Sequence, residues 1–195
     1  MKKFNPLVGL IALAVGIGLY LVGQYNSLVS ADEQVKEAWS NVETQYQRRA
    51  DLIDNLVNTV KWYAAHEEWV LLKVVEARSK ALQTKVDLND PNSIAQFQQS
   101  QDELSSALSR LLMIVENYPD LKANENFLTL QAQLEGTENR IANARRKYNE
   151  AVRRYNTLIR RFPTNFIAQK YWFTPKVGFK SQPWAEQAPE VNFDK

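Results

Sequence analysis

A long uncharged stretch near the N-terminus limits what this chain can fold into more than any other feature. No charged side chain occurs between Lys3 and Asp32, and residues 7–23 form an apolar run of 17 residues. With the flanking Phe4 and Tyr25 the stretch reaches 22 residues, and a helix needs about 20 to cross a bilayer. The sequence therefore predicts a transmembrane anchor over residues 1–25.

A cleaved signal peptide is the alternative, because Val29 and Ala31 would stand at positions −3 and −1 of a cleavage site. The apolar run is longer than the usual core of a signal peptide and ends well before that site, so we prefer a retained anchor. Two lysines precede the span, whereas residues 32–37 after it are net acidic. The positive-inside rule then predicts a cytoplasmic N-terminus and an extracytoplasmic C-terminal domain.

Small residues recur four apart inside the span, as Ala12 with Gly16 and as Ala14 with Gly18. This spacing lets two membrane helices approach closely, but it also arises often by chance. Two interpretations stay open: a face on which transmembrane helices pack, or a spacing that has arisen by chance.

Three segments after the anchor carry apolar residues at helical spacing without interior proline. The first, residues 26–84, would be about 80 Å long over residues 30–82 as one helix, and a break near residues 62–68 is the alternative. The second ends before Pro119, and the third runs from about residue 124 to Pro163. The apolar rows of the first segment are Trp39, Tyr46, Ile53 and Val60, flanked by Val35, Val42, Arg49, Leu56 and Tyr63; that of the third is Leu130, Leu134, Thr137, Ile141, Ala144, Tyr148, Ala151, Tyr155, Leu158 and Phe162.

These stripes determine the expected fold class. No segment shows the two-residue alternation of a β-strand, so the chain is expected to be all-α. The transmembrane helix should continue into an elongated antiparallel helical bundle of three to four long helices over residues 26–163. Residues 164–195 mix aromatic residues with proline and should be irregular, apart from one turn near residues 165–169. Their aromatic side chains need burial, along the bundle as we prefer, or on a partner.

The third segment also contains a short repeat of two cations followed by an aromatic residue, with copies seven residues apart. Tyr148, Tyr155 and Phe162 are expected on the core seam, with the cations beside it. These cations form a basic face that binds anionic lipid headgroups, binds an acidic partner or, as we prefer, pairs with carboxylates of this chain. The basic face is Arg146, Lys147, Arg153, Arg154, Arg160 and Arg161, and the carboxylates considered are Glu43, Asp51, Asp54 and Glu76.

Arg49 falls within the apolar seam of the first segment, where a buried guanidinium would need a carboxylate partner. Glu135 and Glu138 on the third segment are the candidates. We interpret these side chains as structural or interaction residues and not as catalytic ones. The full set of structural and interaction residues is Arg49, Glu135, Glu138, Trp39, Tyr148 and Tyr155.

The sequence offers little for catalysis. Cysteine is absent, His66 is the single histidine, and Val70 stands where a zinc-protease motif needs its second histidine. The net charge of +2 is too small to indicate nucleic-acid binding. We therefore expect no enzyme activity, no metal or other cofactor, no nucleic-acid partner and no small-molecule substrate. A ligand between helices would be sought only at the pair Arg48 and Arg49.

Several sequence blocks, in this order, resemble the LemA family. They are YNSLV (25–29), AWS (38–40), QRRADLIDNLV (47–57), AAHE (64–67), YPDLKANENF (118–127), LEGTENRI (134–141), ARRKYN (144–149) and YN (155–156). The family commonly has proline where Asp54 stands and glycine where Trp62 stands, and both departures favour a straighter first helix here.

The resemblance implies a bacterial membrane-anchored helical bundle without established enzymatic activity, placed in the inner membrane. Relatives are associated with membrane biogenesis, including that of magnetosomes, and with membrane proteases. We hypothesise a non-catalytic scaffold that forms homo-oligomers and organises the lipid bilayer or membrane proteins. The alternative is an accessory subunit for a membrane protein partner such as a protease.

Overall fold

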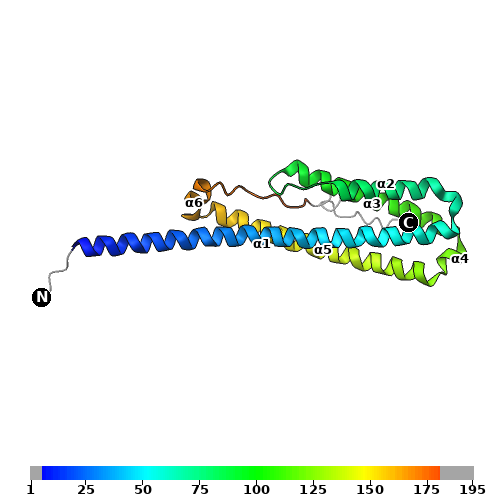
Figure 1. The fold of residues 1–195 in the computed structure, drawn as a ribbon, viewed down its shortest axis with the longest axis horizontal. Helices are drawn as coiled ribbons and strands as arrows, with labels where there is room; N and C mark the ends of the chain where they lie inside the picture. The colour runs from blue at the N-terminus through cyan, green and yellow to red at the C-terminus, as the bar shows by residue number, and fades with distance from the viewer. Residues whose placement is uncertain (1–5, 181–195) are drawn as a thin grey trace, which may run out of the picture.

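The computed structural model describes residues 6–180, and every regular element within that range is a helix. The all-α prediction is therefore confirmed for this range, which contains no strand (Figure 1). The helices are α1 (Pro6–Tyr63), the short 3-10 helix η1 (Ala65–Glu67), α2 (Glu68–Gln83), α3 (Pro91–Val115), α4 (Pro119–Lys122), α5 (Glu125–Arg160) and α6 (Thr164–Lys170).

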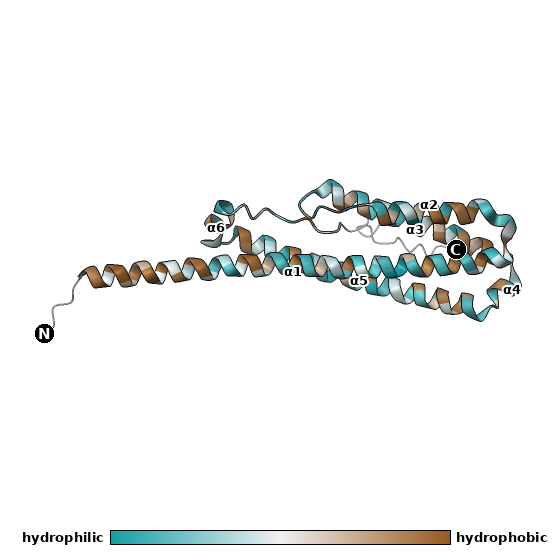
Figure 2. Cartoon of the chain, in the orientation of Figure 1, coloured by the Kyte–Doolittle hydropathy of each residue, from teal (hydrophilic) through white to brown (hydrophobic). Residues whose placement is uncertain are grey.

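Helix α1 joins the apolar segment to the bundle without interruption. Its 58 residues give a length of about 87 Å at 1.5 Å per residue. The N-terminal part is mostly apolar and projects away from the other helices (Figure 2), with Leu10 and Leu19 more than 60% exposed. Among the described residues this is the one stretch long and apolar enough to cross a membrane, and none of it is buried inside the protein.

The chain reverses direction after Tyr63, so the interpretation of residues 30–82 as one helix is wrong and the alternative break is present. Ala64 leaves the helical conformation (φ −125°, ψ 50°), and α2 returns along α1, where Arg78 Nε donates to the carbonyl oxygen of Ala50 at 2.8 Å. Folding back buries the apolar face of α2 against α1 and α3. Helix α1 nevertheless runs unbroken through Asp54 and Trp62.

Helix α5 lies antiparallel to α1 along most of the bundle. Three contacts mark this register: Tyr63 with Asn124, Arg49 with Glu138, and Gln24 with Thr164. Helices α2 and α3 accompany only the part of this pair that is distant from the apolar segment (Figure 1). The bundle therefore has four helices at its distal end and two long helices at its proximal end.

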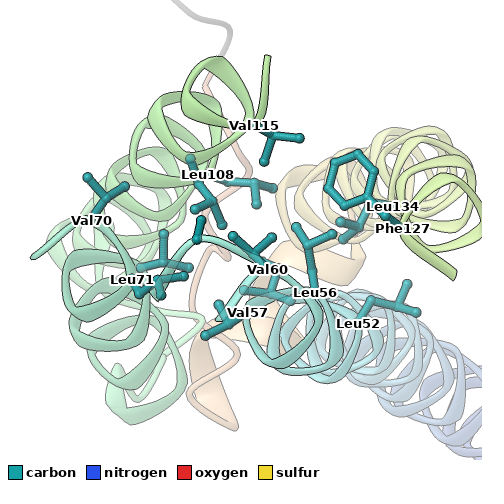
Figure 3. Packing of buried hydrophobic residues seen from close by; sticks show 14 of the residues in the cluster. Leu52, Leu56, Val57, Val60, Val70, Leu71, Leu108, Val115, Phe127 and Leu134 are labelled. Atoms are coloured by element: carbon teal, nitrogen blue, oxygen red, sulfur yellow. The ribbon is translucent and has the colours of Figure 1, made fainter. Parts of the chain in front are cut away.

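Two buried clusters follow from this arrangement. The distal core draws on α1, α2, α3 and α5, and its side chains point toward one another in Figure 3. It includes Leu56, Val60, Leu71, Val74, Leu104, Leu108, Leu111, Val115, Phe127 and Leu134. The proximal core includes Leu28, Val35, Trp39, Val42, Tyr46, Ile94, Phe97, Ile141, Tyr148, Val152, Tyr155, Ile159 and Phe179.

The seam of α5 departs from the expected one near its C-terminal end. Val152 and Ile159 are buried, whereas Ala151 and Leu158 are only half-buried. A strict seven-residue repeat drifts by about 20° per heptad on a straight helix, so the buried row moves one residue along. Phe162 is 76% exposed, which corrects its expected place on the core seam, because α5 ends at Arg160. Tyr63, in the last turn of α1, is likewise exposed.

Candidate functional site

The proximal core has a third wall that sequence periodicity does not predict. Where α2 and α3 no longer cover α1 and α5, residues 174–180 run past them in extended conformation. We call this segment the strap. Figure 1 shows it running from α6 back toward the α2–α3 end of the bundle. It is also tied to the loop before α3, since the amide of Val177 donates to the carbonyl oxygen of Leu88 at 3.0 Å.

Two asparagines of α5 hold the strap by its backbone. Asn149 donates to the carbonyl oxygen of Phe179 at 3.1 Å and accepts from the amide of the same residue at 2.8 Å. Asn156 makes the same pair of bonds with Lys176, at 2.8 Å and 2.9 Å. Each carboxamide therefore replaces the partner that a neighbouring β-strand would supply.

Two tyrosines next to these asparagines add a second pair of contacts. The hydroxyl of Tyr148 donates to the carbonyl oxygen of Val177 at 2.7 Å, and that of Tyr155 donates to Thr174 at 3.0 Å. Burial raises the pKa of Tyr148, and burial with the nearby Asp32 carboxylate raises the pKa of Tyr155 to about 12. Both hydroxyls consequently stay protonated donors at physiological pH.

The repeat distances of helix and strap match. Seven residues of an α-helix rise about 10.5 Å, and three residues of extended chain cover about 9–10 Å. Tyr148-Asn149 and Tyr155-Asn156 are one heptad apart, so they meet strap positions three residues apart. Helical periodicity predicts both tyrosines on the seam, but it does not identify the two asparagines. The repeated Tyr-Asn pair was the signal that could have identified them.

An aromatic cluster seats the end of the strap. The ring of Phe179 is 7% exposed and lies against Trp39 and Tyr148, with centroids 5.7 Å and 5.6 Å away. The guanidinium of Arg145 lies over the same ring at 4.5 Å. Gly178 leaves room for this contact, because a Cβ there would lie 2.8 Å from the Asn149 side-chain oxygen and would force that side chain to shift.

A shielded ion pair fixes the middle of the strap to α1. Lys176 Nζ lies 3.1 Å from Asp32 Oδ1, and both side chains are at most 15% exposed. Lys36 approaches the other carboxylate oxygen at 2.9 Å. Burial alone would raise the pKa of Asp32, but the two ammonium groups outweigh it and hold the pKa below its ordinary value.

Of the two candidate partners of Arg49, Glu138 is the one that contacts it. Arg49 is 3% exposed, and its Nε lies 3.0 Å from Glu138 Oε1, a charge contact outside hydrogen-bond geometry. Its Nη2 donates to Ser105 Oγ at 2.6 Å. Glu135 is exposed. Arg48 is exposed too, whereas Arg49 is buried, so Arg48 and Arg49 do not converge on a shared ligand site.

The basic face does not pair as expected. All six of its cations are exposed, and no ion pair involves them within residues 6–180. Two of the carboxylates considered have other partners, since Asp54 pairs with Arg78 and Glu76 with Lys73. The preferred pairing is therefore wrong for the described part of the chain.

The tail aromatics divide between burial and exposure. Phe179 is buried and Phe173 half-buried on the bundle, as preferred, but Tyr171 and Trp172 are 51% and 86% exposed. Trp184 and Phe193 lie outside the described residues. In the span, Gly16 and Gly18 face open space, where an added Cβ would meet no atom within 4 Å.

The geometry of the strap site suits recognition of an extended backbone. Six hydrogen bonds join side chains of α5 to main-chain groups of the strap. In the described residues, no group of three or more His, Cys, Asp or Glu side chains is placed to hold a metal ion.

Several known proteins resemble this chain over most of its length. The family model described as "LemA family" matches residues 38–193, about four-fifths of the chain. Protein LemA of Metamycoplasma hominis is 28% identical over 159 residues, covering 81% of this chain and 70% of that protein. Magnetosome protein MamQ 2 of Paramagnetospirillum magneticum and magnetosome protein MamQ of Magnetospirillum gryphiswaldense are 26% and 25% identical over 188 residues, covering 87% of this chain and 67% of each relative. Because the family model matches about four-fifths of the chain, the strap included, this chain belongs to the LemA family.

Proposed function

We propose that this protein is a membrane-anchored, non-catalytic helical scaffold that self-associates and organises the membrane or its proteins. The observation that carries the proposal is the continuity of α1. One helix supplies the exposed apolar segment and, without a linker, the wall of both cores. A joint of this kind transmits position and orientation from the bilayer to the bundle, which suits a structural role. The magnetosome proteins among the relatives support a role at a membrane.

The expected location is the bacterial inner membrane, with the N-terminus in the cytoplasm and the bundle outside it. The support is the charge difference across the span. Two lysines, at positions outside the described residues, precede it, and the net acidic set Asp32, Glu33, Lys36 and Glu37 follows it. Protease treatment of spheroplasts tests this orientation, because the bundle should be cleaved without permeabilisation. Protection of the bundle in intact spheroplasts would reverse the topology.

Self-association through the span is supported by its open glycines. Ala12 with Gly16 and Ala14 with Gly18 form two small-residue faces, and nothing in the monomer occupies the space beside the glycines. Replacing either glycine therefore disturbs no contact within the monomer, so a change in assembly reports on contacts between copies.

The natural absence of cysteine makes a direct test available. Gly16→Cys and Gly18→Cys probe the two small-residue faces, and Ile17→Cys, about 100° around the helix from each, is the matched control. Oxidative crosslinking in native membranes should give dimers for one of the glycine variants and much less for the control. Mild chemical crosslinking followed by sizing then covers contacts between bundles. Monomer alone in both experiments would overturn the scaffold proposal.

A second candidate function is that of an accessory subunit for a membrane protein partner. The observation favouring it is a groove of about 800 Å³ between α2 and α3 in the distal half. Its lining includes the apolar Val70, Ala77 and Ala107, the 63% exposed Trp69 and several charged side chains. An amphipathic helix of a partner would suit such a groove.

Co-purification from mildly solubilised membranes tests this candidate. Trp69→Ser should lose a stoichiometric partner that Trp62→Ser retains, because Trp62 is an exposed tryptophan that lies outside this groove. Identical recovery with both variants would remove the groove from consideration.

A further inference from the structure

The end of the bundle nearest the span carries a surface that neither core explains. Helix α6 packs on α1 there: Thr164 Oγ1 donates to Gln24 Oε1 at 2.8 Å, and the rings of Tyr25 and Tyr171 are 4.9 Å apart. Gln24 directly follows the last residue of the apolar run. The beginning of α6 therefore lies at the level where the span ends (Figure 2).

Aromatic side chains are exposed around this short helix although its other side is buried. Ile167 and Ala168 pack into the proximal core, whereas Phe162 is 76%, Phe166 62% and Trp172 86% exposed. Phe162 and Phe166 contact each other, with ring centroids 5.9 Å apart. A cluster of large apolar side chains in water is unfavourable, so its presence indicates an interaction surface.

Packing within the bundle explains Trp172 least well among these exposed aromatic residues. Its backbone is left-handed, with φ 55°, where glycine or asparagine is the favourable choice. Its indole is almost fully exposed, so core packing does not account for a tryptophan here. A contact beyond the described residues would account for it.

The charge of this region has one sign. Residues 160–176 contain no carboxylate, and Arg160, Arg161 and Lys170 are exposed beside the aromatic side chains. Tryptophan and tyrosine concentrate at the boundary between lipid and water, and exposed cations there favour anionic headgroups. The surface thus has the chemistry of a bilayer interface.

We propose that residues 160–172 form a second membrane contact, a foot, that enters the headgroup layer of the same leaflet from which α1 emerges. Phe162, Phe166 and Trp172 sit at the edge of the hydrocarbon, and the three cations contact anionic headgroups. The inference rests on the proposed anchoring of α1. A single helix leaves the bundle free to tilt and rotate, whereas a foot beside it fixes the face that the bundle presents.

The experiment uses the full chain reconstituted into vesicles of neutral phosphatidylcholine, with or without anionic phosphatidylglycerol. Single-cysteine variants carry a polarity-sensitive fluorophore at Phe166→Cys and Trp172→Cys in the foot. Trp62→Cys is the matched control, because Trp62 is 88% exposed and lies at the distal end. Val15→Cys reports on the span itself. Circular dichroism of each variant verifies the helix content.

The foot predicts blue-shifted emission and several-fold weaker quenching by aqueous iodide at positions 166 and 172 than at position 62. The protection should increase with anionic lipid and decrease when Arg161→Glu and Lys170→Glu are added. Equal quenching at positions 166, 172 and 62, with position 15 shielded, would overturn the foot and leave the anchor standing. Quenching at position 15 would instead overturn the anchor.

Discussion

The side chains of Asn149 and Asn156, which hold the strap by its backbone, are called clamps below. Removing one clamp is the sharpest test of the strap site. Asn149→Ala deletes two hydrogen bonds to the backbone of Phe179, one accepted and one donated. A hydrogen bond contributes about 0.5–1.5 kcal/mol net, so the strap should lose about 1–3 kcal/mol of its closing free energy. At 1.4 kcal/mol per factor of ten, opening becomes roughly 5- to 150-fold more frequent.

Hydrogen exchange measures this opening directly, because the amides of Lys176 and Phe179 depend on the clamps for protection. Both should exchange faster in Asn149→Ala, by the factor above. Asn143→Ala is the control, since Asn143 is exposed on the same helix and accepts from Arg146, its neighbour on α5. Asn149→Asp keeps the acceptor for the Phe179 amide but places a carboxylate against its carbonyl oxygen, so it should also loosen the strap. Unchanged exchange in Asn149→Ala, or the same change in the control, would refute the clamp.

Three further predictions concern the surroundings of the strap and the Arg49 site. Phe179→Ala should lower the free energy of unfolding by about 3–5 kcal/mol in urea titrations, because it leaves a cavity where the ring packs in the proximal core. Glu138→Ala should lower the free energy of unfolding by about 1–2 kcal/mol in the same assay, because the buried Arg49 keeps only the neutral Ser105 as a partner. Arg49→Met should lower it by less, because it removes the buried charge itself. The reverse order would contradict the pairing. The folded-state pKa of Asp32 is lowered, so its contribution is complete above the unfolded value near 3.9 and is lost as pH falls through the folded value. Lys176→Met should therefore flatten the loss of stability with acid in that range, and an unchanged slope would exclude the ion pair as its cause.

The second long segment after the anchor shows how much local pattern can reveal. Asp90 caps α3 by accepting from the amide of Asn92, and Pro91 takes the first helical position, as both residue types favour. The apolar residues from Ile94 to Val115 then bury one face at helical spacing. The N-cap, the first residue, the buried face and the end of α3 all depend on residues a few positions apart, so these features can be predicted from the sequence alone.

The strap site could not be inferred in the same way. Asn149 and Phe179 are 30 residues apart, and an asparagine beside a seam has the same local pattern as one in water. The choice of Glu138 over Glu135 for Arg49, and the exposure of the basic face, also depend on how two helices are aligned. Periodicity shows which face of a helix is buried, but it does not show at what height a neighbour meets it.

The apolar run, the all-helical character and most of the seams were set by the sequence itself, because hydrophobic spacing and proline placement act within a single helix. The reversal after Tyr63, the two-helix proximal end and its closure by the strap were decided only by the tertiary structure. The reason is a difference in length: α2 and α3 accompany α1 and α5 for only part of their extent, and the uncovered seam needs another wall. Residues 174–180 supply that wall, and two Tyr-Asn pairs one heptad apart hold it there.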